Sequence, residues 1–205
     1  MSAARLAVLL SGRGSNFEAI ADAVETGVIP DASIVAVISD NPEAGGLEAA
    51  RRRELPAVAI DRSRFSTGGE HEAEIARALE SARPDLICLA GYMRILSAGL
   101  VGRYRGRILN IHPSLLPRFP GLHPQKQALE AGETESGCTV HLVDEGTDTG
   151  PRVLSARVPV IPGDTVESLS ARILEQEHRL YPEAIARVLE GLRGGPNVAH
   201  VTVHL

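Results

Sequence analysis

An amide and an imidazole stand two positions apart in the segment 108–120, Ile-Leu-Asn-Ile-His-Pro-Ser-Leu-Leu-Pro-Arg-Phe-Pro. The segment begins with alternating apolar and polar residues, as a strand does, so the side chains of Asn110 and His112 share one face. Asn110 can donate hydrogen bonds to an oxygen that gains charge, and His112 can exchange protons near neutral pH. Pro113 has no N–H donor and ends the strand. We therefore expect both side chains at the carboxyl end of a strand, where open α/β sheets bind ligands.

The run Asn-Ile-His-Pro-Ser-Leu-Leu-Pro at 110–117, followed by Gly-Leu-His at 121–123, resembles the signature of the folate-dependent formyltransferases. The members of that family move a formyl group from 10-formyltetrahydrofolate to an amine. The likeness covers roughly residues 6–194 and is greatest to the members that formylate glycinamide ribonucleotide in de novo purine (IMP) biosynthesis. It implies direct attack of the glycine amine, a tetrahedral intermediate stabilised by Asn110 and His112, and no metal.

A second candidate site is Ser-Gly-Arg-Gly-Ser-Asn at 11–16, which we call the glycine loop. It follows an apolar run and precedes a helical pattern, an arrangement that offers backbone N–H groups and a helix dipole to an anion. A dinucleotide fingerprint is disfavoured because Phe17 takes the place of its third glycine. A helix cap without a ligand is one remaining alternative. The other is a phosphate site formed by Gly14, Ser15 and Asn16.

The acidic segment Asp-Glu-Gly-Thr-Asp-Thr-Gly-Pro at 144–151 contains two glycines and can bend a carboxylate into a site. By its residues alone it is more typical of a solvated loop. Its match to the family's aspartate loop implies instead that Asp148 assists Asn110 and His112 as a third catalytic residue. His141, in the strand pattern before this segment, is interpreted as a supporting residue.

The resemblance also implies binding roles for other residues. The segment Met-Arg-Ile-Leu at 93–96, which otherwise reads as a strand-to-helix loop, would line the folate pocket, and Glu177 would contact the ribose hydroxyls. The residues expected to bind the formyl donor are Met93, Arg94, Ile95, Leu96, Asn110, Val143 and Asp144. One position departs from the family, because Gly68 stands where an arginine often meets the benzoyl-glutamate tail. Either Arg62 or Arg64 replaces that arginine, or the tail is held less tightly.

Strand and helix patterns alternate along the chain, which predicts a Rossmann-like, doubly wound α/β fold. Its sheet should be mostly parallel, with an antiparallel extension in the C-terminal half. We expect a single domain, 1–205, with a phosphate-binding half (1–106), a folate-binding and catalytic half (107–195) and a tail (196–205), in which residues 198–205 are interpreted as an edge strand. Asp40 is interpreted as a turn residue, Asp164 as the cap of the last long helix, and Pro182 as a kink or break in it.

The composition limits the classes of function. The 205 residues are 43% hydrophobic, enough for one sizeable core, and the net charge of −5 argues against a nucleic-acid surface. No apolar run reaches membrane-spanning length and no secretory signal pattern opens the chain. Cys88 and Cys138 suit buried fillers in a reducing compartment. We therefore predict a cytoplasmic protein with no membrane or nucleic-acid partner, and a homodimer is among its expected assemblies.

Other functions remain open on the sequence. Methionyl-tRNA formyltransferase and formyl-folate hydrolase share the family's asparagine, histidine and aspartate, but each normally carries a further domain for which we expect no room in 205 residues. A phosphate-binding module without catalysis belongs to a different class. Such a module would explain the glycine loop and leave the segment 108–120 unexplained.

Overall fold

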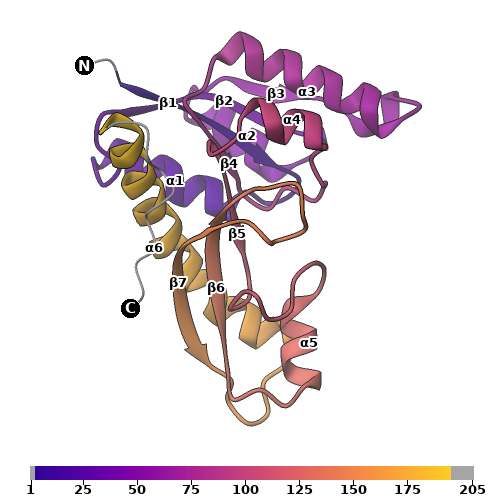
Figure 1. Ribbon diagram of the computed structural model, residues 1–205, viewed down its shortest axis with the longest axis vertical. Coiled ribbons are helices and arrows are strands. Elements are labelled where there is room, and N and C mark those ends of the chain that lie inside the picture. Colours follow the sequence, from indigo (N-terminus) through magenta and orange to yellow (C-terminus); the bar gives the residue numbers. More distant parts are fainter. Residues whose placement is uncertain (1–2, 195–205) are drawn as a thin grey trace.

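The computed structural model describes residues 3–194, which form one sheet flanked by helices (Figure 1). The strands are β1 (Ala4–Leu10), β2 (Ala32–Ser39), β3 (Ala57–Ala59), β4 (Leu86–Leu89), β5 (Ile108–His112), β6 (Glu135–Leu142) and β7 (Arg152–Pro159). The helices are α1 (Ser15–Glu25), α2 (Gly45–Arg52), the 3-10 turn η1 (Arg62–Arg64), α3 (Gly68–Ala82), α4 (Ala98–Arg103), α5 (Pro124–Glu130) and α6 (Val166–Arg193).

The seven strands lie in the order β3-β2-β1-β4-β5-β6-β7. Strands β1 to β5 are parallel to one another, whereas β6 runs antiparallel to both β5 and β7. The predicted fold class, a mostly parallel α/β sheet with an antiparallel extension in the C-terminal half, is therefore confirmed.

Helices cover both faces of the parallel part of the sheet because successive strand residues point to opposite sides. In β1, Leu6 and Val8 pack into a core shared with α1, α2 and α6. Ala7 and Leu9 pack into a second core with α3 and α4. Both faces are thus apolar, which explains why the buried parallel strands read as continuous apolar runs.

The antiparallel pairing of β5 with β6 sets up the site. Asn110 lies opposite His141, and His112 lies opposite Thr139. Directly opposed residues of two antiparallel strands share a face of the sheet. Because Leu109 packs into the core under α6, these four polar side chains lie on the other face.

The proline-rich loop after His112 is fastened to β6 by Thr139. The Thr139 hydroxyl donates to the carbonyl of Ser114 at 2.7 Å and accepts from the N–H of Leu116 at 3.1 Å. The peptide bond between Leu116 and Pro117 is cis. The loop therefore has a defined course over the end of β5.

Helix α4 forms although its sequence has a low helical propensity. It has six residues, two of them glycine, and glycine costs about 1 kcal/mol relative to alanine in a helix interior. Ser97 caps the helix by accepting from the N–H of Leu100 at 3.3 Å, and Leu100 and Val101 pack against the sheet. Tertiary packing, rather than helical propensity, accounts for this element.

The start of α6 corrects an expectation, because its cap is Thr165 and not Asp164. The Thr165 hydroxyl accepts from the N–H of Ser168 at 3.2 Å. The Asp164 carboxylate instead accepts from the N–H of Ile161 and pairs with Arg172, both at 2.8 Å. Pro182 lies inside a continuous helix, so the break that its position allowed does not occur.

Some expectations are not tested by the fold. The predicted edge strand at 198–205 lies outside the described residues. The division at residue 106 remains a prediction, as do the cytoplasmic location and the homodimer. Within residues 3–194 no helix is both long and apolar enough to cross a membrane.

Candidate active site

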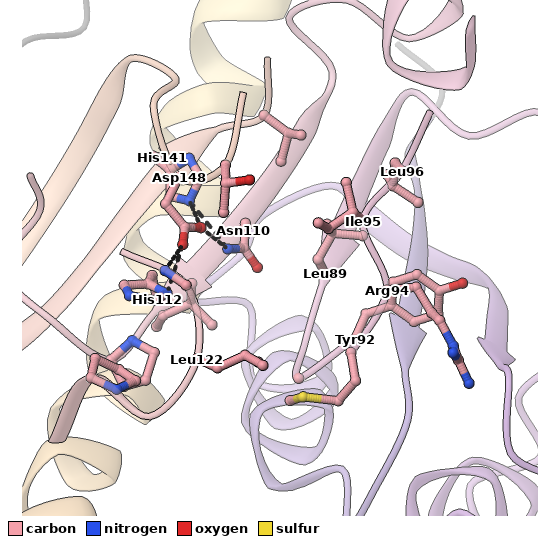
Figure 2. Close-up of a pocket in the computed structure, with 18 of the residues that line it drawn as sticks. Leu89, Tyr92, Arg94, Ile95, Leu96, Asn110, His112, Leu122, His141 and Asp148 are labelled. Atoms are coloured by element: carbon pink, nitrogen blue, oxygen red, sulfur yellow. Dashed lines mark hydrogen bonds and ion pairs between the residues drawn. The ribbon is translucent and has the colours of Figure 1, made fainter. Parts of the chain in front are cut away.

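A cavity of about 420 Å³ lies at the carboxyl ends of β4 and β5 (Figure 2). Its volume falls within the range of roughly 300–1,000 Å³ that is usual for small-molecule sites. Three loops form its walls: residues 91–96 after β4, residues 121–125 before and at the start of α5, and the loop after β6. Nine of the site residues expected from the sequence line this cavity: Met93, Arg94, Ile95, Leu96, Asn110, His112, Val143, Asp144 and Asp148.

Asp148 lies between two histidines and an amide at one end of the cavity. One carboxylate oxygen, Oδ2, lies 3.3 Å from Nδ1 of His112, and the other, Oδ1, lies 3.4 Å from Nε2 of His141. Asn110 Nδ2 lies 3.1 Å from the same nitrogen of His141 and 3.5 Å from Asp148 Oδ1 (Figure 2). The structure thus brings together the three residues expected to be catalytic, with His141 as their direct neighbour.

Both ring nitrogens of His112 face acceptors. Nε2 lies 2.9 Å from the carbonyl oxygen of Phe119, and because a carbonyl only accepts, this nitrogen carries a hydrogen. Nδ1 faces the Asp148 carboxylate. An imidazolium ring satisfies both contacts, and the His112 side chain is almost fully buried, so its orientation is fixed.

The charge of Asp148 is stabilised by its surroundings. Partial burial by itself would raise the pKa of the Asp148 carboxyl, but hydrogen bonds from His141 and from the Gly121 N–H, and the proximity of His112, hold it below its usual value. The Gly121 N–H donates to Oδ2 at 2.8 Å. Asp148 is therefore a carboxylate at neutral pH.

The backbone of the loop after β6 explains how Asp148 reaches the cavity. Asp148 has a φ of 56°, in the left-handed region that Asp tolerates better than most residues. A Cβ atom at Gly150 would collide with the carbonyl oxygen of Leu142. The close approach of the chain at Gly150 to the end of β6 therefore requires glycine. This approach turns the loop back over β6.

The segment after β4, residues 91–96, will be called the wall segment. Leu96 is buried, whereas Met93 and Ile95 expose 68% and 81% of their surface. The Arg94 side chain points away from Asn110 and out of the cavity (Figure 2). Its Nε donates to the carboxylate of Asp40 at 2.8 Å. Asp40 lies in the bend that follows β2, and its buried side chain also forms an ion pair across the sheet edge, which its interpretation as a turn residue did not include.

The residues expected to bind the ribonucleotide lie outside this cavity. Gly14 is the N-cap of α1 with a φ of 85°, and Ser15 begins the helix. Asn16 donates from Nδ2 to Oε2 of Glu177 at 2.7 Å, although the two residues are 161 positions apart. The structure thus joins two residues that the sequence assigned separately to a phosphate and a ribose.

The Asn16–Glu177 pair is deeply buried. Burial raises the pKa of the Glu177 carboxyl, and the hydrogen bond from Asn16 opposes that effect. Among the described residues, Oδ1 of Asn16 is buried without a hydrogen-bond partner. A buried acceptor of this kind is costly unless a ligand supplies a donor.

The position that departs from the family is the first residue of α3, Gly68. Of the two arginines considered as replacements, Arg62 is half-buried and donates to the carbonyl oxygen of Phe65 at 2.8 Å. Arg64 exposes 81% of its side chain. Arg64 is thus the more accessible of the two.

Several contributors to the site were not identified from the sequence. The carbonyl of Phe119 and the N–H of Gly121 hold His112 and Asp148 through backbone atoms, which side-chain patterns do not reveal. Ser11 and Asp40 contact the wall segment from another part of the chain. Across residues 3–194, no group of three or more His, Cys, Asp or Glu side chains could hold a metal ion.

One class of proteins accounts for this fold and this set of residues. Residues 4–185 match the formyl transferase family, and the chain belongs to that family, as the resemblance in its motifs predicted. Among single-activity relatives, it is 45% identical over 198 residues to the phosphoribosylglycinamide formyltransferase of Haemophilus influenzae, a match of 96% of this chain and 93% of the relative.

Two further matches extend the comparison. The chain is 51% identical over 188 residues to the trifunctional purine biosynthetic protein adenosine-3 of Drosophila melanogaster, which covers 91% of this chain but only 14% of that protein. The crystal structure of glycinamide ribonucleotide transformylase 1 from Symbiobacterium toebii matches with a TM-score of 0.89 and 49% identity. That match covers 92% of this chain and 89% of the other.

Proposed function

We propose that this protein transfers the formyl group of 10-formyltetrahydrofolate to the glycine amine of 5-phosphoribosylglycinamide. The products are formylglycinamide ribonucleotide and tetrahydrofolate, in de novo purine biosynthesis. The observation that carries the proposal is the convergence of Asn110, His112 and Asp148 at one end of a cavity large enough for a pterin. The names of relatives matched over most of their length support the choice of substrates.

The reaction forms one C–N bond and breaks another. The neutral glycine amine attacks the formyl carbon, and the carbonyl oxygen gains negative charge in a tetrahedral intermediate. Its collapse breaks the bond to the folate nitrogen and restores the carbonyl. The attacking nitrogen loses one proton and the leaving folate nitrogen gains one, so no redox partner is needed.

Asn110 and His112 are suited to stabilise the charged oxygen. The Asn110 amide carries two hydrogens, and one of them shared between His141 and Asp148 would leave the other for a substrate oxygen. The 3.3 Å contact of His112 Nδ1 with Asp148 is longer than the 2.7–2.9 Å of a tight charge-assisted hydrogen bond. The Nδ1 hydrogen is therefore not held tightly by Asp148, and a substrate oxygen placed beside the carboxylate can share it. Catalytic hydrogen bonds are often long before the substrate binds.

Asp148 has two roles in this proposal. As a carboxylate it balances the charge of an imidazolium at His112 and keeps the ring oriented. It can also hold a water that carries the proton from the amine toward the folate nitrogen. General acid–base assistance of this kind contributes roughly 10²–10⁴-fold to a rate.

The two substrates would approach from different elements. The phosphate would bind to Gly14, Ser15 and Asn16 of the glycine loop, and the ribose hydroxyls to Glu177. The pterin would lie against the wall segment and against Val143 and Asp144, which line the cavity. Residues 1–106 would thus hold mainly the phosphate, and residues 107–195 the folate and the reacting groups.

The experiment is to follow the absorbance change when the purified protein meets 10-formyltetrahydrofolate, with and without glycinamide ribonucleotide. Loss of the formyl group that requires the ribonucleotide would establish the transferase. Loss at the same rate without any amine would indicate a hydrolase. No loss under either condition would leave a binding module and contradict the proposal.

A further inference from the structure

We propose that Ser11 and Asp40 are positioning residues for the formyl donor, although both lie among elements on the phosphate side of the sheet. The proposal rests on the proposed function, because it names what holds the donor's pocket in shape. Neither residue lines the cavity. Each one acts by holding the wall segment, residues 91–96, in place.

Ser11 holds the first half of the wall segment through two hydrogen bonds. Its backbone N–H donates to the carbonyl of Gly91 at 3.1 Å, and its hydroxyl accepts from the N–H of Met93 at 2.9 Å. Gly91, with a φ of 74°, turns the chain sharply after β4. The first residue of the glycine loop therefore fixes the turn with which the wall segment begins.

Asp40 holds the second half of the wall segment. Its carboxylate, at the end of β2, exposes only 5% of its side-chain surface and accepts from Nε of Arg94 at 2.8 Å. Asn41, the next residue, donates from Nδ2 to the carbonyl of Ser11 at 3.4 Å. The ends of β1 and β2 are thus linked to each other and to the wall segment.

The wall segment depends on these contacts because it lies outside the helices and strands. Met93 and Ile95 are mostly exposed and contribute little packing that would hold the backbone. At the far end of the segment, the N–H of Ser97 donates to Glu72 at 2.7 Å. Between the two ends, the contacts with Ser11 and Asp40 keep the apolar side chains facing the cavity, so the donor need not order them on binding.

The test compares Ser11→Ala and Asp40→Ala with the parent protein. We expect each substitution to raise the KM for the formyl donor roughly three- to tenfold, the effect of one lost hydrogen bond. The KM for the ribonucleotide should stay within about twofold of the parent value, since the substituted groups act on the pocket of the formyl donor. A merely structural role for Ser11 in the glycine loop would raise the KM for the ribonucleotide instead.

Asp164→Ala is the matched control. Asp164 also exposes 5% of its side chain and pairs with an arginine at 2.8 Å, but it does not line the cavity or contact the wall segment. It should lower the melting temperature as Asp40→Ala does and leave the KM for the donor unchanged. An equal rise in that KM for both variants would show a general effect of destabilisation and overturn the proposal.

A binding measurement separates this proposal from the proposed function. Tetrahydrofolate is titrated into the parent protein and each variant, and its Kd is followed by fluorescence. If the parent binds tetrahydrofolate but transfers no formyl group, weaker binding by Ser11→Ala and Asp40→Ala still supports the positioning role. If the parent binds tetrahydrofolate and both variants bind it equally well, the positioning role is wrong whatever the activity. If the parent binds none, both proposals fail.

Discussion

The Asp148 carboxylate lies 3.3 Å from Nδ1 of His112, and it is held there by the N–H of Gly121 at 2.8 Å. One oxygen therefore meets both the ring and a backbone donor. The carboxylate charge, more than the shape of the side chain, should matter for catalysis, because an amide in its place could still accept from Gly121.

Asp148→Asn tests that charge. We expect kcat to fall by roughly 10²–10⁴-fold, because the imidazolium of His112 loses its counter-charge and the proton route loses its base. Steady-state kinetics measure the loss. Glu145→Gln, an acidic residue of the same loop that pairs with Arg105, is the control and should change kcat by less than about threefold. A kcat within tenfold of the parent for Asp148→Asn would contradict the assigned role.

Asn110→Ala tests stabilisation of the oxyanion. Removing one donor of this kind typically costs about 10²–10³-fold in kcat, and we expect a loss in that range. Binding of tetrahydrofolate should weaken much less than turnover, because the charged oxygen exists only during the reaction. If binding and turnover fall by the same factor, Asn110 contributes to substrate binding in the ground state, and the oxyanion role is wrong.

The raised pKa of Glu177 predicts a pH dependence of stability. Between the ordinary glutamate pKa of about 4.5 and its raised value in the folded protein, the native state binds more protons than the unfolded chain. The free energy of unfolding should therefore fall as the pH rises through this window. Urea unfolding at several pH values measures it.

Glu177→Gln is the variant for the same measurement. The side-chain oxygen of glutamine can still accept from Asn16 Nδ2, and this variant should lack the component of pH dependence that Glu177 contributes. We expect the difference in unfolding free energy between parent and variant to shift in favour of the variant as the pH rises. A difference that stays constant with pH would mean that Glu177 titrates normally.

Gly14→Ala tests the geometry of the glycine loop. Gly14 has a φ of 85°, and a Cβ there would lie 2.5 Å from the Cα of Gly46. We expect this variant to lose about 1–3 kcal/mol of unfolding free energy, through strain and the forced separation of the two segments. The KM for the ribonucleotide should rise with it.

Gly12→Ala is the control in the same loop. No atom lies within 4 Å of a Cβ built at Gly12. Its unfolding free energy should stay within about 0.5 kcal/mol of the parent value, as for other surface changes. Equal destabilisation by both substitutions would refute the argument from the close approach to Gly46.

The sequence by itself determined the features that repeat over a few residues. The alternation of apolar runs and helical patterns predicted the mostly parallel α/β sheet, and the two-residue period placed Asn110 and His112 on one face. Pro113 marked the end of their strand. These features follow from local backbone geometry, which each residue and its near neighbours set.

Only the tertiary structure decided which distant side chains meet. It paired Asn16 with Glu177, brought Asp148 between His112 and His141, and made Asp40 the partner of Arg94. It also showed that Thr165 caps α6, whereas Asp164 pairs with Arg172. Such contacts depend on strand register and on how loops cross the sheet edge, and no short stretch of sequence contains that information.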